Sequence, residues 1–255
     1  GSLKISFLYL ERIYTDVKKM IDKKYLVVTY HYVIDDKHPF KALKGILFDD
    51  FARQLKDIKK TYKIISLSDI AASIGGELNF PKVSAALTFD DGLKEHFRIA
   101  QFLSDQGLAA SFFVPSSILD QKKVLPVHKF HLLAASLGKN LFPKIVNRLK
   151  GGDKKIFDAE FLRNQTVPKH RGEYDDENTR RFKYAFNFLL DKKSGEEAVS
   201  SIFSEVYPDE ACAHDFLYLS KRDVAAIASL GHEIGSHGHN HVPLASLKDA
   251  EAEKE

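Results

Sequence analysis

Two short motifs in this sequence carry the residue types that metal-assisted hydrolysis uses. The first is Thr-Phe-Asp-Asp-Gly at residues 88–92, and the second is Ser-His-Gly-His-Asn-His at residues 236–241. His237 and His241 are four positions apart, so a turn can bring both imidazole rings to one side. Together with one of the two adjacent aspartates they would form a metal site with open coordination positions, as hydrolysis requires.

Each motif also has an ordinary interpretation. Asp-Asp-Gly on its own is usually a turn, and a histidine-rich hexapeptide on its own is ambiguous, although three imidazoles within five residues are costly to place without a partner such as a metal. Both motifs, however, directly follow predicted strands. Since ligand and catalytic groups of α/β proteins gather at the carboxyl ends of strands, we expect the two motifs to meet at one site.

Alternating strands and helices must position these motifs. Runs rich in β-branched and aromatic residues predict a first strand within residues 25–33, ending at His31, and further strands at residues 64–65, 84–89, 109–114 and 233–235. Helical periodicity predicts helices at residues 48–60, 68–74, 93–106 and 222–230. Ser220 and Asp223 suit a capping box before the last of these helices. The alternation predicts an α/β fold with a parallel sheet or an α/β barrel.

The middle of the chain, from about residue 118 to 216, differs in character. It consists of helical patterns separated by charged loops that contain glycine, and we expect it to be a helical insertion. We expect a single domain over residues 1–255, with its core formed by residues 25–117 and 217–255.

The C-terminal part of the sequence predicts an incomplete architecture. About five strands are predicted where a closed barrel needs eight. The final predicted helix carries Glu251, Glu253 and Glu255 at the end where the helix dipole disfavours negative charge. We therefore expect that this helix has been cut and that the barrel is incomplete at its C-terminus.

Composition limits the classes of function. Lys and Arg total 38 and Asp and Glu total 35 in a chain of 255 residues, without a basic cluster, so a nucleic-acid partner is not expected. The single cysteine, Cys212, excludes an intrachain disulfide framework and is expected to be a structural thiol. No segment approaches the roughly 20 apolar residues of a membrane span. We expect a cytoplasmic protein, or an extracellular or periplasmic one if an export signal was removed.

Several segments together resemble the polysaccharide deacetylases, which are the carbohydrate esterases of family four with NodB homology. The TFDDG motif followed by a helix, the ASFFV segment at residues 110–114 and the GHEIGSHGHNHVPLASL segment at residues 231–247 are similar to the first two signature motifs of that family. The opening TYHYV segment resembles the N-terminal portion of many bacterial members. The resemblance covers most of residues 25–117 and 217–250, and it implies a distorted (β/α) barrel.

The resemblance also implies a role for each matched residue. Asp90 matches the general base, and Asp91, His237 and His241 match the ligands of a divalent metal. The metal is expected to be zinc, with cobalt, nickel, manganese and iron as alternatives. The implied reaction is hydrolysis of N-acetyl groups on an amino-sugar polysaccharide or glycan, so the implied partner is a carbohydrate. His31, at the end of the first predicted strand, is a candidate substrate-binding residue.

The sequence departs from the family pattern in two places. Gly238 stands where Ser or Thr usually braces the loop by a hydrogen bond. The family's later motifs supply an arginine near the base, an oxyanion-stabilising backbone N–H and a general-acid histidine, and none of them is found in residues 242–255. Two alternatives therefore stay open: a non-catalytic carbohydrate- or metal-binding module, and a hydrolase of small amides on the same scaffold.

Overall fold

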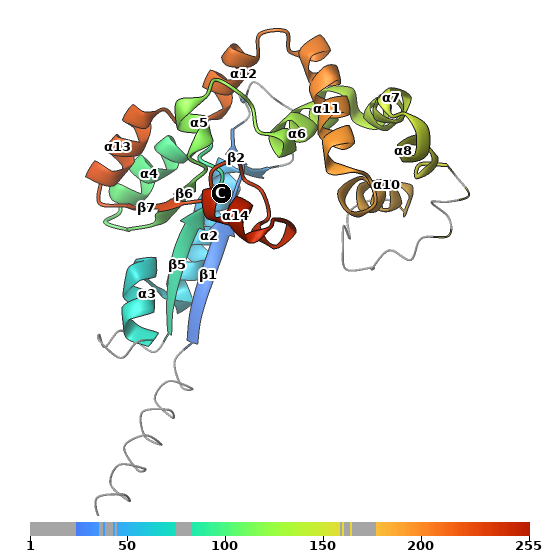
Figure 1. Cartoon of the computed structure of the whole chain (residues 1–255). Coiled ribbons are helices and arrows are strands. Elements are labelled where there is room, and N and C mark those ends of the chain that lie inside the picture. Colours follow the sequence, from blue (N-terminus) through green and yellow to red (C-terminus); the bar gives the residue numbers. More distant parts are fainter. Residues whose placement is uncertain are drawn as a thin grey trace, which may run out of the picture. The chain divides into compact units, whose positions relative to one another are not determined.

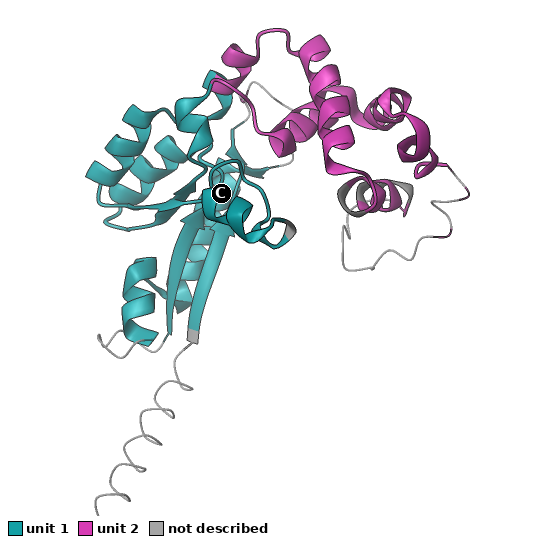
Figure 2. Cartoon of the chain, in the orientation of Figure 1, with its two compact units in different colours: residues 1–37, 45–121, 215–255 teal, residues 38–44, 122–214 magenta. Residues whose placement is uncertain are grey.

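The computed structural model describes two compact units of the chain (Figure 2). The first unit comprises residues 1–37, 45–121 and 215–255, and the second comprises residues 38–44 and 122–214. The described residues within these ranges are 24–35, 38, 43, 45–74, 83–158, 160, 164 and 177–255.

A parallel sheet organises the first unit (Figure 1). Its described strands are β1 (Lys24–Tyr30), β4 (Lys63–Ile64), β5 (Val83–Phe89), β6 (Ser111–Val114) and β7 (Glu233–Ser236). The strand order is β1-β5-β6-β7, β4 also pairs with β5, and every pair is parallel. The central strand, β5, is an apolar run that is buried along most of its length, which is typical of a strand covered on both faces. The predicted α/β fold with a parallel sheet is confirmed.

Two short strands form a separate sheet in this unit. They are β2 (Val33–Ile34) and β3 (Ile46–Leu47), and they pair in parallel. The first predicted strand, expected to end at His31, ends at Tyr30, and Val33 from the same run of strand-forming residues pairs elsewhere.

The helices of the first unit follow the predicted pattern closely. They are α2 (Phe48–Thr61), α3 (Leu67–Ile74), α4 (His96–Ser104), α5 (Ser117–Asp120), α13 (Lys221–Ser229) and α14 (Asp249–Lys254), with a 3₁₀ turn, η2 (Leu244–Ser246). The predicted capping box is confirmed, because the Ser220 hydroxyl accepts from the Asp223 N–H and the Asp223 carboxylate accepts from the Ser220 N–H. None of the helices that the structure describes has the length and apolar character needed to cross a bilayer.

The main hydrophobic core lies on one face of the sheet. Tyr30, Phe89 and Phe112 come from three neighbouring strands, and their rings stack, with 5.4 Å between the Tyr30 and Phe89 centroids and 4.9 Å between the Phe89 and Phe112 centroids. Helices α2, α4 and α13 cover this face with the buried side chains Phe51, Leu55, Ile99, Ala100, Leu103 and Ile227. Because these helices pack on the strands that carry both motifs, the core fixes the strand ends in place.

The opposite face of the sheet is covered in part by α3. Ile65, Ile70 and Ala86 form a smaller core there. The Glu233 carboxylate on β7 accepts hydrogen bonds from the backbone N–H groups of Leu67 and Ser68. These N–H groups belong to the first turn of α3 and have no acceptor within the helix, and a negative charge is favourable at this end of a helix. α3 is thereby anchored to the edge strand of the sheet.

The described residues of the second unit form helices and no strand. The helices are α6 (Pro126–Leu137), η1 (Gly138–Asn140), α7 (Leu141–Arg148), α8 (Gly151–Lys155), α10 (Glu177–Phe188) and α11 (Lys192–Val206), and α12 (Glu210–Leu217) runs from this unit into the first. Their core includes Leu132, Leu133, Ile145, Ile202 and Phe203.

Cys212 lies on α12 and is exposed, so the expectation of a structural thiol is wrong. The reason is its position on the helix. Ala213 and Leu217, four residues apart, face inward and are buried, which leaves position 212 on the solvent side.

Candidate metal centre

The first motif forms a sharp turn at the carboxyl end of β5. Asp90 extends the pairing with β1, because its N–H donates to the Tyr30 carbonyl over 3.0 Å. Asp91 and Gly92 then adopt left-handed backbone conformations, with φ of 79° and 61°. A Cβ atom at Gly92 would lie 2.8 Å from Ile118 Cδ1 and 2.9 Å from Val114 Cγ1, so both the backbone angle and the space require glycine.

A segment that follows α12 holds this turn. Leu93 and Tyr218 form an antiparallel bridge, the Leu219 N–H donates to the Gly92 carbonyl over 2.9 Å, and the Lys94 N–H donates to the Leu217 carbonyl over 2.9 Å. This bridge is also the reason that α4 begins at His96 and not at Leu93 as predicted.

The second motif forms a loop at the carboxyl end of β7. The His237 N–H donates to the Val114 carbonyl at the end of β6, over 3.1 Å. The N–H groups of Ser116 and Ser117 donate to the carbonyls of Gly238 and His239, each over 3.0 Å. Since β6 lies between β5 and β7 in the sheet, these bonds bring the histidine loop to the same edge as the aspartate turn.

The structure brings the three predicted ligands together. Nε2 of His241 lies 3.1 Å and Nε2 of His237 lies 3.4 Å from Oδ1 of Asp91, and the three candidate ligand atoms all lie within 4.8 Å of one another. Ligands about 2.0–2.2 Å from a zinc ion are about 3–3.5 Å apart at tetrahedral or octahedral angles. Among the described residues no other group of three or more His, Cys, Asp or Glu side chains gathers in this way. Both distances to Oδ1 of Asp91 match this spacing, and imidazole and carboxylate groups are ordinary ligands of such ions, so the three residues fit a divalent ion.

The environment of the ligands suits such an ion. The Asp91 side chain is buried, while both histidine side chains are about a third exposed, which leaves one side of the cluster accessible. The hydrogen bond to Asp91 raises the pKa of His241, and burial opposes this rise. Asp91 and His241 are also the two non-glycine residues with positive φ among those that the structure describes, and strained backbone of this kind is concentrated at functional sites.

Asp90 and His31 lie beside the ligand cluster and not within it. Oδ2 of Asp90 is 3.9 Å from Nε2 of His31. Burial raises the pKa of the Asp90 carboxyl, and the nearby imidazoles of His237 and His31 counteract part of this effect. His31, by contrast, has 52% of its side chain exposed. The two adjacent aspartates thus occupy different environments, one held by both imidazoles of the cluster and one next to an accessible histidine.

Two further residues, Ser116 and Glu255, contact the histidine loop, and the sequence did not predict either contact. The Ser116 hydroxyl lies 2.8 Å from Nδ1 of His239, so this third histidine is engaged outside the ligand cluster. The Glu255 carboxylate accepts hydrogen bonds from backbone N–H groups of the same loop. A glutamate that was predicted to be unfavourable at a helix end is thus paired with a distant loop, and no local sequence pattern reports such a contact.

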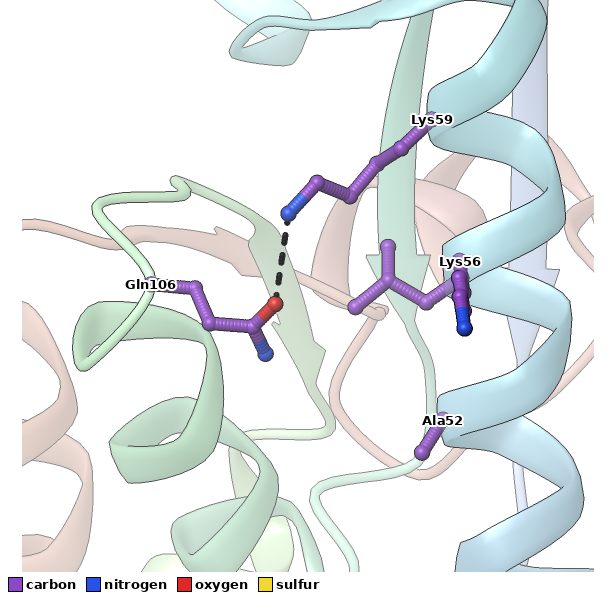
Figure 3. A pocket seen from close by; sticks show the side chains of 5 residues that line it. Ala52, Lys56, Lys59 and Gln106 are labelled. Atoms are coloured by element: carbon purple, nitrogen blue, oxygen red, sulfur yellow. Dashed lines mark hydrogen bonds between the residues drawn. The ribbon is translucent and has the colours of Figure 1, made fainter.

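A separate pocket lies on the helix-covered side of the first unit (Figure 3). It is lined by Ala52, Leu55, Lys56, Lys59 and Gln106, and Lys59 donates a hydrogen bond to the Gln106 side chain over 3.3 Å. It contains none of the predicted site residues.

Comparisons with known proteins give matches among solved structures. The chain is similar to a de-N-acetylase from Aggregatibacter actinomycetemcomitans (25% identity, TM-score 0.33, covering 38% of this chain and 39% of that one) and to IcaB from Ammonifex degensii (20% identity, TM-score 0.34, 45% and 50%). It is also similar to the deacetylase PplD of Streptococcus pyogenes (15% identity, TM-score 0.32, 63% and 79%). The match spans about two fifths to one half of the first two structures. No protein-family model and no curated protein matches the sequence.

Proposed function

We propose that this chain is a metal-dependent deacetylase that hydrolyses N-acetyl groups on an amino-sugar polysaccharide or glycan. One observation carries the proposal: Asp91, His237 and His241, which the sequence separates widely, present their ligand atoms to one another at metal-site distances, with a second carboxylate alongside. The substrate class comes from the resemblance of the two motifs to the polysaccharide deacetylases.

Each residue of the site has a separate role in the proposed reaction. Asp91, His237 and His241 would hold a divalent ion, which we take to be zinc, and this ion would supply polarisation of the acetyl carbonyl and a lowered pKa of a water molecule. Asp90 accepts the proton of the attacking water, and this proton then passes to the amine nitrogen as the C–N bond breaks, which leaves acetate and the free amine. Because burial raises its pKa, it is closer to the pH at which a general base is effective than an ordinary aspartate is. His31, accessible and next to Asp90, contacts the substrate.

We also propose the corresponding architecture. The chain is a single NodB-like domain with its core in residues 25–117 and 217–255 and a helical insertion at about 118–216, and its parallel sheet belongs to a distorted (β/α) barrel. Helices α2, α4 and α13 on one face of the sheet support this proposal, because the helices of such barrels form an outer ring.

Two substitutions of the adjacent aspartates test the proposed reaction. Asp90→Asn keeps the size of the side chain and removes the proton acceptor, so it should preserve metal content and lower kcat by about 10²- to 10⁴-fold. Asp91→Asn should lose both metal and activity. The measurements are metal analysis of the purified chain and release of acetate from N-acetylglucosamine oligomers.

The same assay separates the alternatives. Turnover that survives in Asp90→Asn contradicts the role of this residue as the base. Metal uptake by the parent chain without acetate release favours a non-catalytic binding module, and hydrolysis of a cyclic imide but not of the glycan favours a small-amide hydrolase.

A further inference from the structure

The side-chain carboxylate of Glu255 is in contact with the loop that carries both histidine ligands. We infer that Glu255 is a positioning residue of the metal centre, which holds the backbone on either side of His241 in the conformation that presents its imidazole to the ion. This inference rests on the proposed function, because it assigns a support to the same site.

A single oxygen of Glu255 accepts hydrogen bonds from three backbone N–H groups of the loop. Oε1 accepts from the backbone N–H groups of His239 over 3.1 Å, Asn240 over 2.7 Å and Val242 over 3.1 Å. Asn240 also donates from its side chain to Oε2 over 3.4 Å. Hydrogen bonds to an ionised acceptor are roughly twice as strong as neutral ones. The residues before and after His241 are thus tied to one point.

The backbone at His241 needs such a support. Its φ of 58° lies in the left-handed region, where a residue with a side chain is strained and persists only if the surrounding structure holds it there. The other end of the loop has its own support, because His237 pairs with the end of β6 and the carbonyls of Gly238 and His239 accept from Ser116 and Ser117. Glu255 is the corresponding contact at the His241 end.

Gly238 fits the same interpretation. A Cβ atom at this position would lie 2.9 Å from Oε1 of Glu255, so any larger residue would press on the carboxylate. In the family that the motif resembles, a Ser or Thr at this position braces the loop. In this chain, glycine leaves room for a carboxylate from another element to brace it.

Substitution of Glu255 tests the inference, with Glu253, in the last turn of the helix that Glu255 follows, as a matched control. Glu255→Ala should weaken zinc or cobalt binding by about 10- to 100-fold, the usual cost of losing an outer-shell partner. Glu255→Gln keeps an acceptor oxygen but loses the charge, so its loss should be smaller. Glu253→Ala removes an exposed carboxylate and should bind like the parent chain. Competition with a chromophoric chelator measures the affinities of the full chain.

Amide hydrogen exchange of the metal-free chain provides a second readout. Glu255→Ala should accelerate exchange at His239, Asn240 and Val242 and leave the amides of β5 protected, which shows that the fold is intact. If exchange also rises in β5, the Glu255→Ala variant has lost its fold, and the metal affinity and loop exchange of the isosteric Glu255→Gln variant are used in its place. Unchanged metal affinity in Glu255→Ala, with or without faster exchange, overturns the inference. A parent chain that binds metal no better than Asp91→Asn contradicts the proposed function instead, and exchange at the three amides still reports whether Glu255 holds the loop.

Discussion

At the scale of single residues, the sequence predicts the members of the candidate metal centre from their residue types and spacing. Two adjacent aspartates after a strand and two histidines four positions apart are enough to predict a metal cluster, and the structure places one aspartate and both histidines together. Glu255 was not predictable, because its contact depends on where α14 lies relative to the histidine loop. The sequence shows only that a negative charge stands near a helix end.

Gly92 provides a test of the turn that carries Asp91. Gly92→Ala should lower the free energy of unfolding, because the new Cβ would press on Val114 and Ile118 and the left-handed φ of 61° disfavours any side chain. A combined loss of about 2–4 kcal/mol is expected from backbone strain and overpacking. Urea denaturation measures it.

Gly107→Ala is the matched control for this substitution. Its φ of 66° is similar, but nothing lies within 4 Å of the added Cβ. It should therefore show the backbone cost alone, about 1–2 kcal/mol. Equal losses in the two variants would contradict a steric role for Val114 and Ile118 at the turn.

At the scale of elements, the sequence predicted which segments form strands and helices better than where they end. The run from Tyr25 to Val33 is uniformly rich in strand-forming residues, yet β1 ends at Tyr30, because Val33 and Ile34 pair with β3. Helix α4 starts late because Leu93 pairs with Tyr218. Both boundaries are set by a partner distant in sequence, which local periodicity does not report.

His232, directly before β7, makes the stability of these elements depend on pH. Its Nδ1 accepts from the Ala110 N–H over 3.2 Å, and its Nε2 therefore carries the hydrogen that it donates to the Ala100 carbonyl over 2.8 Å. If the ring were protonated, Nδ1 would also carry a hydrogen, which would point at the Ala110 N–H and break this hydrogen bond. Burial lowers the pKa of His232, and the bond to Ala100 opposes this only in part.

The sign of the pH effect follows from this lowered pKa. As pH falls below about 6.5, the unfolded chain takes up a proton at this position that the folded chain does not yet bind. The contribution of His232 to the free energy of unfolding should therefore be fully present above pH 6.5 and decline below it. The decline is at most about 1.4 kcal/mol per pH unit and stops once the pH is below the pKa of His232 in the folded chain. Urea denaturation at pH 7.5, 6.5 and 5.5 measures the slope.

His232→Gln isolates the contribution of this histidine. The variant should be less stable than the parent at pH 7.5 but should lose less stability between pH 7.5 and pH 5.5. If the free energies of unfolding of the two proteins fell equally between pH 7.5 and pH 5.5, His232 would not be the cause of the acid sensitivity.

At the scale of the whole molecule, the α/β class and the parallel sheet followed from the alternation of strands and helices. The pairing of β4 and β6 with the same edge of β5 did not, because periodicity shows which face of a strand is buried and not which strand lies beside it. The division into two compact units also depends on contacts between distant segments.

Metal binding should stabilise the unit that contains the sheet. A ligand that binds the folded state contributes about 2.7 kcal/mol at one hundred times its Kd, which corresponds to roughly 5–10 °C in Tm for a protein of this size. Thermal unfolding followed by circular dichroism with and without zinc measures the shift. A chelator should reverse it and Asp91→Asn should abolish it, whereas a shift that persists in Asp91→Asn would place the metal elsewhere.

The pairing of β6 with β7 has a consequence for the order of folding. Ser111 pairs with Glu233, and the main part of the second unit, residues 122–214, lies between them in the chain. Closing a loop of this length costs chain entropy before the contacts of β7, and before those of residues 217–219 with the aspartate turn, can form. The two imidazoles can reach the Asp91 carboxylate only once this loop has closed. A metal ion held by these three side chains would therefore stabilise the closed loop.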